Sequence, residues 1–197
     1  MINSSETQII CLVGKSCSGK DSIMKQLVAE EGFLPCVSHT TRPMRDCELE
    51  GIEYYFINNS TFKDKMINED FVEVREYNTV YGVWRYGIDR HRLNELLNKG
   101  NVIMILDVDG LTKFYNSEYG RRIISFYIDV DLKTRIQRSL DRETLTIQNL
   151  EECVRRAKAD EKDFVDAYKV CDYTIKPVSS YCGKLMILDI LSWEGVR

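Results

Sequence analysis

The chain has 197 residues, of which 44% are hydrophobic and 29% are charged, which is the composition of an ordinary globular protein. Its 27 basic and 31 acidic residues give a net charge of -4, which disfavours nucleic acid or an anionic membrane as a partner. The longest apolar runs, 102–106 and 185–188, are far shorter than the roughly 20 residues that span a bilayer. No export signal is recognisable at the N-terminus, so we expect a cytoplasmic protein.

Seven cysteines are present, and we expect them to be free thiols. Their number is odd, and the sequence contains no C-x-x-C pair with a neighbouring histidine of the kind that binds zinc. The sequence therefore favours neither a disulfide framework nor a metal site of cysteine and histidine.

Strands and helices are predicted to alternate along the chain. The apolar run 9–13 predicts a strand, and 21–31 carries apolar residues at helical spacing up to Gly32, which is expected to end the helix. Further strands are predicted at 34–37, 102–106, 123–128 and 173–175, and further helices after Asp89, after Asp131, at 150–165 and around 185–191. This order predicts an α/β fold whose parallel sheet core is covered by helices on both faces.

The segment 54–87 breaks this alternation. Within it, Val72 and Val74 alternate with Glu73 and Arg75, which predicts a strand in a smaller sheet with one polar face. We therefore expect an inserted lobe within a single domain.

Residues 14–20 read GKSCSGK and match the G-x-x-x-x-G-K part of the phosphate-binding loop, between a predicted strand and a predicted helix. Glycines let backbone N–H groups turn toward phosphate, and the helix N-terminus adds partial positive charge; a plain glycine-rich helix entry is the alternative. Asp21 stands where the motif has Ser or Thr, so we favour the hydroxyl of Ser22 as the contact to Mg²⁺. Lys20 is expected to reach the β and γ phosphates of ATP. The predicted ATP-binding residues are Gly14, Lys15, Ser16, Cys17, Ser18, Gly19, Lys20, Asp21 and Ser22.

Two further blocks, SHTTRPMR at 38–45 and GIEYYF at 51–56, closely resemble the S-x-T-T-R-x-x-R and G-x-x-Y-x-F blocks of guanylate kinases. The resemblance extends from the loop at 14–20 to an arginine-rich stretch at 135–156. It implies a P-loop kinase that transfers the γ-phosphate of ATP to GMP. The implied parts are a core (1–37, 89–140 and 157–197), a small mixed-sheet lobe that binds the nucleoside monophosphate (38–88) and a helical lid (141–156).

The residues of the first block suit an acceptor phosphate. Arg42 and Arg45 supply planar donors, and Ser38 and Tyr54 supply hydroxyl groups, which together match a phosphate dianion. The resemblance implies that these four residues hold the phosphate of the acceptor. The alternative is surface ion pairing with the acidic residues that follow.

The resemblance also implies how the base is read. Glu73 matches the carboxylate that accepts the ring N–H and amino protons of guanine, and Tyr86 matches a tyrosine that touches the acceptor phosphate. An exposed strand carboxylate paired with Arg75 is the alternative for Glu73. Ile88 stands where the family has a Ser or Thr hydroxyl that supports guanine binding.

Asp107 and Asp109 follow a buried strand, at the edge of the sheet where α/β proteins bind ligands. Asp107 is expected to hold Mg²⁺ through water and Asp109 to face the acceptor, with helix capping as the alternative for both. Arginines around the polar stretch 143–149 are expected to stabilise the transferring phosphoryl group when the lid closes. The predicted catalytic residues are Lys20, Arg138, Arg142 and Arg156.

Together these features predict an ATP- and Mg²⁺-dependent kinase that converts GMP or dGMP to GDP or dGDP. Two other functions stay open. Ile88 and the long segment before Tyr86 motivate a kinase of the same fold that acts on another phosphorylated acceptor. A non-catalytic guanylate-kinase-like binding module is the other, although the intact loop at 14–20 argues against it. The sequence leaves open the oligomeric state and whether Cys17 makes the protein redox-sensitive.

Overall fold

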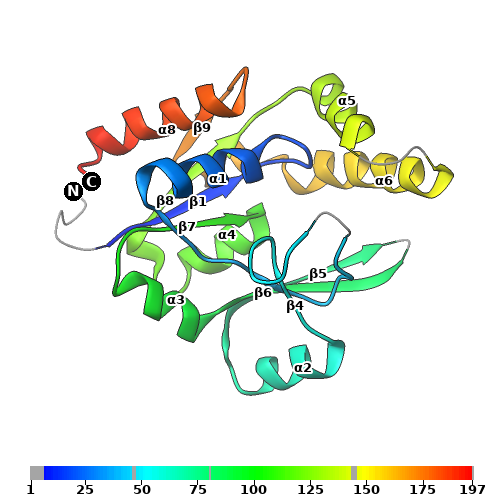
Figure 1. Ribbon diagram of the computed structural model, residues 1–197, viewed down its shortest axis with the longest axis horizontal. Coiled ribbons are helices and arrows are strands. Elements are labelled where there is room, and N and C mark those ends of the chain that lie inside the picture. Colours follow the sequence, from blue (N-terminus) through cyan, green and yellow to red (C-terminus); the bar gives the residue numbers. More distant parts are fainter. Residues whose placement is uncertain (1–6, 46–47, 80, 143–145, 197) are drawn as a thin grey trace.

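The structure is a computed structural model that describes residues 7–45, 48–79, 81–142 and 146–196. A five-stranded parallel sheet forms its core, in the order β2-β7-β1-β8-β9 (Figure 1). The strands are β1 (Ile9–Val13), β2 (Leu34–Pro35), β7 (Val102–Leu106), β8 (Ile123–Ile128) and β9 (Tyr173–Ile175). The parallel core sheet predicted from the alternation of elements is confirmed.

Helices cover both faces of this sheet because successive side chains of the fully buried central strand point to opposite sides. Ile10 and Leu12 pack with α1 (Lys20–Glu31) and α8 (Ser180–Trp193). The alternate residues of β1 pack with α3 (Arg90–Leu97) and α4 (Val108–Tyr115). Burial on both faces explains why β1 and β8 read as continuous apolar runs.

Several elements differ from those expected. The predicted strand at 34–37 is the two-residue β2, and the last helix starts at Ser180 because the Ser179 side chain accepts a hydrogen bond from the backbone N–H of Cys182. The helices at 150–165 and after Asp131 are α6 (Ile147–Asp163) and α5 (Leu132–Arg142). Three further helices were not expected: α2 (Asn59–Ile67), the 3-10 helix η1 (Gly120–Arg122) and α7 (Ala167–Val170). The α4 helix lies where helix capping was the alternative role of Asp107.

The inserted segment forms a second sheet of mixed direction, in the order β4-β3-β6-β5. Its strands are β3 (His39–Thr40), β4 (Tyr55–Phe56), β5 (Phe71–Thr79) and β6 (Gly82–Asp89). The α2 helix packs on this sheet, where the rings of Phe62 and Phe71 lie 4.6 Å apart. The predicted small sheet is therefore present.

The expected polar face of β5 does not point to solvent. Glu73 and Arg75 are buried, whereas Val72 and Val74 are only half-buried. The reason is that this face lies against α4, where a β-carbon on Gly110 would be 3.0 Å from Cδ of Arg75. The alternative of an exposed Glu73 paired with Arg75 is therefore right about the partner and wrong about the exposure.

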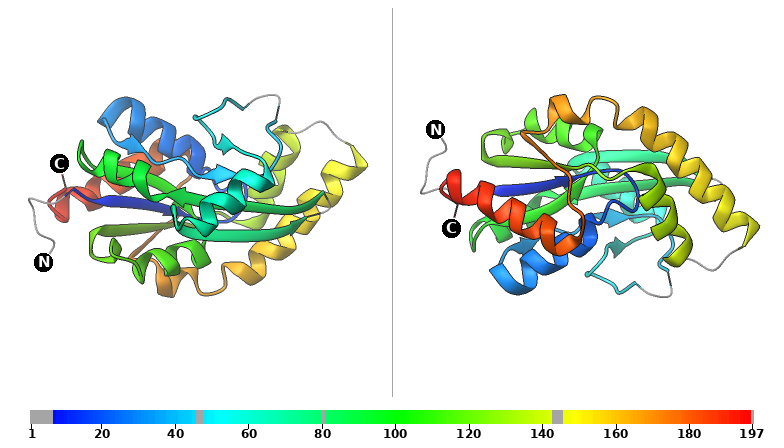
Figure 2. Two further views of the ribbon diagram at one scale, coloured as in Figure 1. Left: turned by 90° about the horizontal axis from the view of Figure 1, so that it is seen from below. Right: turned by 90° about the horizontal axis from the view of Figure 1, so that it is seen from above.

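The α5 and α6 helices extend away from the core sheet, and α6 lies beside the β5–β6 hairpin (Figure 2). Arg155 of α6 donates from Nη1 to the carbonyl oxygen of Asn78 in β5 at 3.5 Å. The expected lid boundary between residues 156 and 157 falls inside the continuous α6 helix. Within the described ranges, no helix has the length and apolar character needed to cross a membrane.

Candidate active site

The loop between β1 and α1 has the tight backbone that its glycines allow. A β-carbon on Gly14 would lie 2.9 Å from the carbonyl oxygen of Ile128, so no larger residue fits there. Gly19, just before α1, has a φ of 100°, and Cys17 also has a positive φ of 60°. The loop therefore ends at the N-terminus of α1. Backbone N–H groups at a helix N-terminus form a binding site for anions such as phosphate.

Lys20 begins α1, and its ammonium group points back into the loop. Its Nζ donates to the carbonyl oxygen of Lys15 at 3.1 Å, and burial lowers the pKa of its ammonium group. Asp21 and Ser22 are exposed in the first turn of α1. The hydroxyl of Ser18 is buried and has no hydrogen-bond partner among the residues described. The loop therefore combines an inward-pointing cation with an unused hydroxyl, as a site for phosphate requires.

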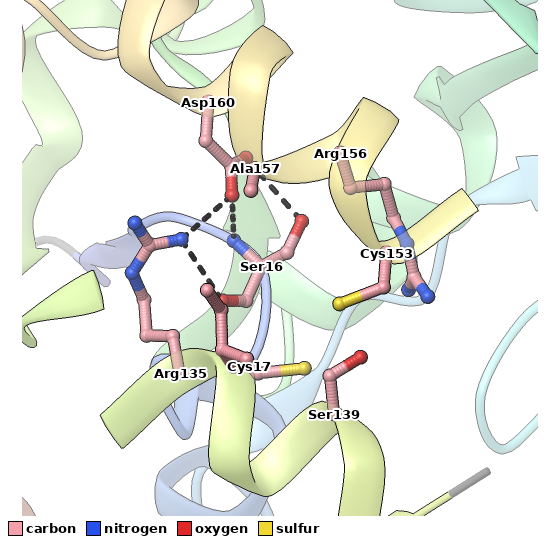
Figure 3. Close-up of a pocket in the computed structure, with 9 residues that line it drawn as sticks. Ser16, Cys17, Arg135, Ser139, Cys153, Arg156, Ala157 and Asp160 are labelled. Carbon is pink, nitrogen blue, oxygen red and sulfur yellow. Dashed lines mark hydrogen bonds and ion pairs between the residues drawn. The ribbon is translucent and has the colours of Figure 1, made fainter. Parts of the chain in front are cut away.

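Side chains from α5 and α6 hold the outside of the loop (Figure 3). The Asp160 carboxylate accepts from the backbone N–H of Ser16 at 3.0 Å and from Nη1 of Arg135 at 2.8 Å. Arg135 is 3% exposed, and burial raises the pKa of Asp160 although Ser16 and Arg135 oppose this shift. The sequence does not single out Arg135 and Asp160, because their only signal is a place among other charged residues on polar helices.

The predicted catalytic arginines reach different positions. Arg138 donates from Nη1 to the carbonyl oxygens of Cys17 and Ser18, each at 3.2 Å. Arg156 lines a cavity of about 10 Å³ into which the free thiols of Cys17 and Cys153 also point (Figure 3). Arg142 ends α5, and its side chain lies outside the part of the chain that the structure describes.

A second, larger cavity lies beside the loop. Its volume is about 310 Å³. It lies between the loop, the start of α1, Arg138 and the segment before α8, and its lining residues are Ser18, Gly19, Ser22, Ile23, Arg138, Pro177, Val178, Ser179 and Ser180. The cavity therefore lies next to the predicted phosphate site and has room for a group attached to the phosphates.

The register of the core sheet brings the loop to Asp107. Val13 pairs with Leu106, so residues 14 and 107 leave neighbouring parallel strands at the same edge. The Asp107 carboxylate caps α4 by accepting from the backbone N–H of Gly110 at 2.7 Å, and it also accepts the hydroxyl proton of Tyr77. Asp107 therefore both caps α4 and lies at the edge of the sheet where α/β proteins bind ligands.

Asp109 is more remote from these groups. Its side chain is 66% exposed and forms an ion pair with Lys113 at 2.6 Å. The Nζ atom of Lys113 also donates to the carbonyl oxygen of Val74, which links α4 to β5. Asp109 lies near the lobe, but the hydrogen bonds found within the described ranges do not join it to the other predicted acceptor residues.

Arg42 is the best-buried cation of the predicted phosphate clamp. It is 5% exposed, and its Nη2 donates to Oε1 of Glu48 at 2.8 Å. Its guanidinium carbon lies 5.2 Å from the ring centre of Tyr54. Arg45 is 39% exposed and lies 3.8 Å from the same Glu48 carboxylate. The Arg42 pair is therefore a buried one, and the alternative of surface ion pairing is wrong for it.

Aromatic residues connect this clamp to the core. The ring centres of Tyr54 and Tyr86 lie 5.6 Å apart, and those of Tyr86 and Tyr77 lie 5.5 Å apart, all at edge-to-face angles. Burial raises the pKa of Tyr54, so its hydroxyl stays protonated and able to donate. Tyr77, which sequence analysis missed, continues the row to Asp107. The period-2 pattern of β5 places Tyr77 on the same face as Glu73 and Arg75.

Glu73 and Ile88 share one face of the β5–β6 pair. They are direct cross-strand partners, next to a register shift between Phe71 and Glu73. Ile88 is fully buried and belongs to the apolar cluster on the α3 and α4 side of the core sheet. The Glu73 side chain is also fully buried, and burial raises the pKa of its carboxyl although Arg75 opposes this shift.

No group of three or more His, Cys, Asp or Glu side chains that could hold a metal ion occurs within the described ranges. A preformed all-protein metal cage is therefore not part of the site in those ranges.

Known proteins with similar sequences or folds include guanylate kinases. The sequence profile of the family "Guanylate kinase" matches residues 6–177. The guanylate kinase of Clostridium tetani is 32% identical over 169 residues, which cover 85% of this chain and 74% of that protein. The guanylate kinase of Symbiobacterium thermophilum is 32% identical over 177 residues, which cover 89% and 80%. The crystal structure of the Anaplasma phagocytophilum guanylate kinase has a similar fold, with a TM-score of 0.69 and 23% identity over 98% of this chain and 88% of that one.

Proposed function

This chain belongs to the guanylate kinase family, and we infer from its site that it transfers the γ-phosphoryl group of ATP to GMP or dGMP. One observation carries this inference: the phosphate loop and the acceptor lobe meet at one edge of the core sheet. Asp107 follows β7 at that edge, beside Gly14. Its carboxylate accepts a hydrogen bond from the hydroxyl of Tyr77 in β5 of the lobe. A donor phosphate on the loop therefore faces a phosphate held by the lobe.

The donor nucleotide fits the loop and the cavity beside it. The β and γ phosphates would accept hydrogen bonds from the loop backbone, from the unused hydroxyl of Ser18 and from Lys20. The nucleoside would extend into the cavity of about 310 Å³ that Gly19, Ser22 and Arg138 help to line. In this arrangement the phosphates of ATP lie on the loop and the nucleoside lies in the cavity beside it.

Mg²⁺ fits this site as a companion of ATP. Protein-bound Mg²⁺ usually keeps several waters and takes few direct side-chain ligands beside the substrate phosphates. Ser22 offers an exposed hydroxyl in the first turn of α1, and Asp107 offers a carboxylate at the edge where the loop begins. We propose that these two residues hold the ion, Asp107 through water. When bound, the ion would neutralise negative charge on the phosphates.

Catalysis in this scheme depends on position and charge. Phosphoryl transfer spreads charge over the migrating oxygens, so it needs cations and alignment but no covalent nucleophile. Lys20 supplies a cation inside the loop, while Arg138 already lies against the loop backbone. We place Arg142 and Arg156 in the same role on the lid, where closure would bring them to the transferring group. Arg42, Arg45, Ser38, Tyr54 and Tyr86 would hold the acceptor phosphate, with Asp109 near it.

Nucleotides are the partners that this proposal requires. ATP and a purine monophosphate are small anions of the cytoplasm, and we propose a cytoplasmic location on that ground. The sequence departs from the family at Ile88, and Glu73 is already paired with Arg75, which keeps another phosphorylated acceptor as the second candidate.

Release of ADP, coupled to an optical assay, tests the function. We expect turnover with GMP and dGMP and little with AMP, because adenine lacks the two donors that Glu73 is proposed to accept. Lys20→Ala should lower kcat by roughly a hundred- to a thousand-fold, since its ammonium stabilises developing phosphoryl charge. Lys63→Ala, an exposed change on α2, is the matched control and should be neutral. Turnover of AMP above GMP would favour the second candidate, and a Lys20→Ala variant with native turnover would contradict the loop assignment.

A further inference from the structure

The carboxylate proposed to read the base already receives two N–H donors. Oε2 of Glu73 accepts from Nε of Arg75 at 2.9 Å, and Oε1 accepts from Nη2 at 3.2 Å. This is a planar, two-donor contact to one carboxylate. Guanine would offer the same pattern, with its ring N–H beside its exocyclic amino group.

The same contact closes Glu73 to solvent. The Glu73 side chain is 0% exposed, and that of Arg75 is only 8% exposed. A base that donates to both carboxylate oxygens must therefore take the place that the Arg75 guanidinium now holds. Acceptor binding and the Glu73–Arg75 pair compete for one set of atoms.

Arg75 has other partners close by. Its Nη2 donates to the hydroxyl of Ser38 at 3.4 Å, and its Nη1 lies 3.9 Å from Oδ1 of Asp107. Gly110 leaves space for this side chain, because a β-carbon there would be 3.3 Å from Nε of Arg75. A displaced guanidinium thus has a second carboxylate within reach and would stay charged and partnered inside the site.

We propose that Arg75 is a specificity-determining residue of the acceptor site: it occupies the base-reading face of Glu73, and an acceptor base binds there only by displacing it. The proposal rests on the proposed function. Only a base with donors for Glu73 replaces the contact that it breaks. In the orientation that turns the ring N–H and amino group of guanine toward Glu73, guanine replaces both hydrogen bonds and hypoxanthine replaces one. Adenine in that orientation replaces none, because its N1 atom is an acceptor and its amino group faces away. Arg75 therefore lowers the affinity for every acceptor base that binds to Glu73, and it leaves the affinity for a base that does not bind to Glu73 almost unchanged.

Titration calorimetry with GMP, IMP, AMP and ATP tests this role. In Arg75→Ala, GMP and IMP should each bind roughly ten- to a hundred-fold more tightly, because neither has to break charged hydrogen bonds to reach Glu73. AMP, which offers Glu73 no donor in the orientation of guanine, should gain much less. The affinity for ATP should change much less, because the hydrogen bonds that Arg75 forms within the described ranges are to Glu73 and Ser38 on the acceptor side.

A control and a second variant keep the test decisive. Arg85→Ala removes the partner of Glu76, which breaks an ion pair between β6 and β5 away from Glu73, and it should leave GMP binding unchanged. Arg75→Lys keeps the charge but cannot form the two-donor contact, so it should tighten GMP binding by a smaller factor; it carries the test if Arg75→Ala does not fold.

Three results would overturn the proposal. Weaker GMP binding in Arg75→Ala or Arg75→Lys would mean that Arg75 itself binds the acceptor. Equal tightening for GMP and AMP would mean that Arg75 only fills space. Unchanged GMP binding would mean that Glu73 does not need to be released. If the native protein turns over GMP while any of these is found, the proposed function stands and only this inference fails. If the native protein neither binds GMP nor phosphorylates it, the proposed function fails and the inference falls with it.

Discussion

At the scale of single residues, the acceptor side of the site relies on buried charge pairs. Arg42 and Glu48 are 5% and 8% exposed, and their oppositely charged groups lie 2.8 Å apart. Glu48 also accepts from the backbone N–H of Arg45 at 2.9 Å, so one carboxylate orients both arginines of the clamp. Removing it would leave the Arg42 guanidinium buried without its carboxylate, which is far more costly than losing a surface pair.

Glu48→Gln should therefore lower the free energy of unfolding at pH 7 by about 3 kcal/mol. Burial alone would raise the pKa of Glu48, but the hydrogen bonds and charge of Arg42 outweigh it and hold the pKa below the ordinary value of 4.5. A carboxyl whose pKa is depressed on folding stabilises the fold above its unfolded pKa, and this contribution is lost as pH falls through the folded value. Urea unfolding at pH 7 and at about pH 4 and below measures both effects, and the difference between native protein and variant should shrink in acid.

Glu76→Gln is the matched control, because Glu76 is 49% exposed in its pair with Arg85. Its loss should change the free energy of unfolding by no more than about 1 kcal/mol. Equal losses for the two variants would show that the Arg42–Glu48 pair behaves as a surface pair.

At the scale of elements, two helices between the core strands β8 and β9 hold the phosphate loop in place. The α5 helix contributes Arg135 and Arg138, and α6 contributes Asp160, which accepts the backbone N–H of Ser16. These contacts join segments about 120 to 145 residues apart in the chain. The loop therefore has its shape partly from its own glycines and partly from the α5–α6 pair.

Asp160→Asn should weaken ATP binding roughly tenfold or more, because it removes the charge that holds Arg135 and replaces one of the two acceptor oxygens used by Arg135 and Ser16 with an amide donor. Glu161→Gln is the control on the next residue of α6. Glu161 pairs with Lys15 and Arg135 as well, but it is 57% exposed, so its change should alter ATP affinity less than about twofold. Titration calorimetry with ATP compares them, and equal effects would contradict the role of the buried carboxylate in shaping the loop.

At the scale of the whole molecule, three parts that are far apart in sequence meet around the loop. The core sheet supplies the edge where residues 14 and 107 emerge, the lobe supplies Tyr77 and Arg75, and α6 touches the lobe through Arg155 and Asn78. A ligand that bridges these parts binds only the folded protein, so it must raise the free energy of unfolding.

ATP at a hundred times its Kd should add about 2.7 kcal/mol to the free energy of unfolding, which for a chain of this size raises Tm by roughly 5 to 10 °C. GMP should give a separate increase, because it binds the lobe rather than the loop. A thermal melt followed by circular dichroism, with each ligand alone and with both, measures these shifts. An ATP shift that is absent, or one that GMP abolishes, would contradict separate donor and acceptor sites on one folded unit.

The sequence by itself determined the features that depend on neighbouring residues. The strand 9–13, the glycine loop and the helix after it follow from local pattern, and they are present as β1, residues 14–19 and α1. Gly32 ends α1 with a φ of 75°, and Asp89 caps α3 through the backbone N–H of Arg92, as expected. The motif blocks also indicated the family from neighbouring residues. The residues of a short block contact one ligand group together, so their spacing can be recognised in the sequence.

Only the tertiary structure decided which of these residues meet. The alternation in β5 separated Glu73 and Arg75 from their neighbours, but it could not show that α4 covers their face. No spacing in the sequence joins Asp160 to Ser16 or Tyr77 to Asp107, since those contacts depend on helix packing and sheet register. Burial and pairing of charges are properties of surfaces brought together from distant segments. For that reason the sequence predicted the phosphate loop, the acceptor clamp and Arg75 as a possible partner of Glu73, while the burial of the Glu73–Arg75 pair came from the fold.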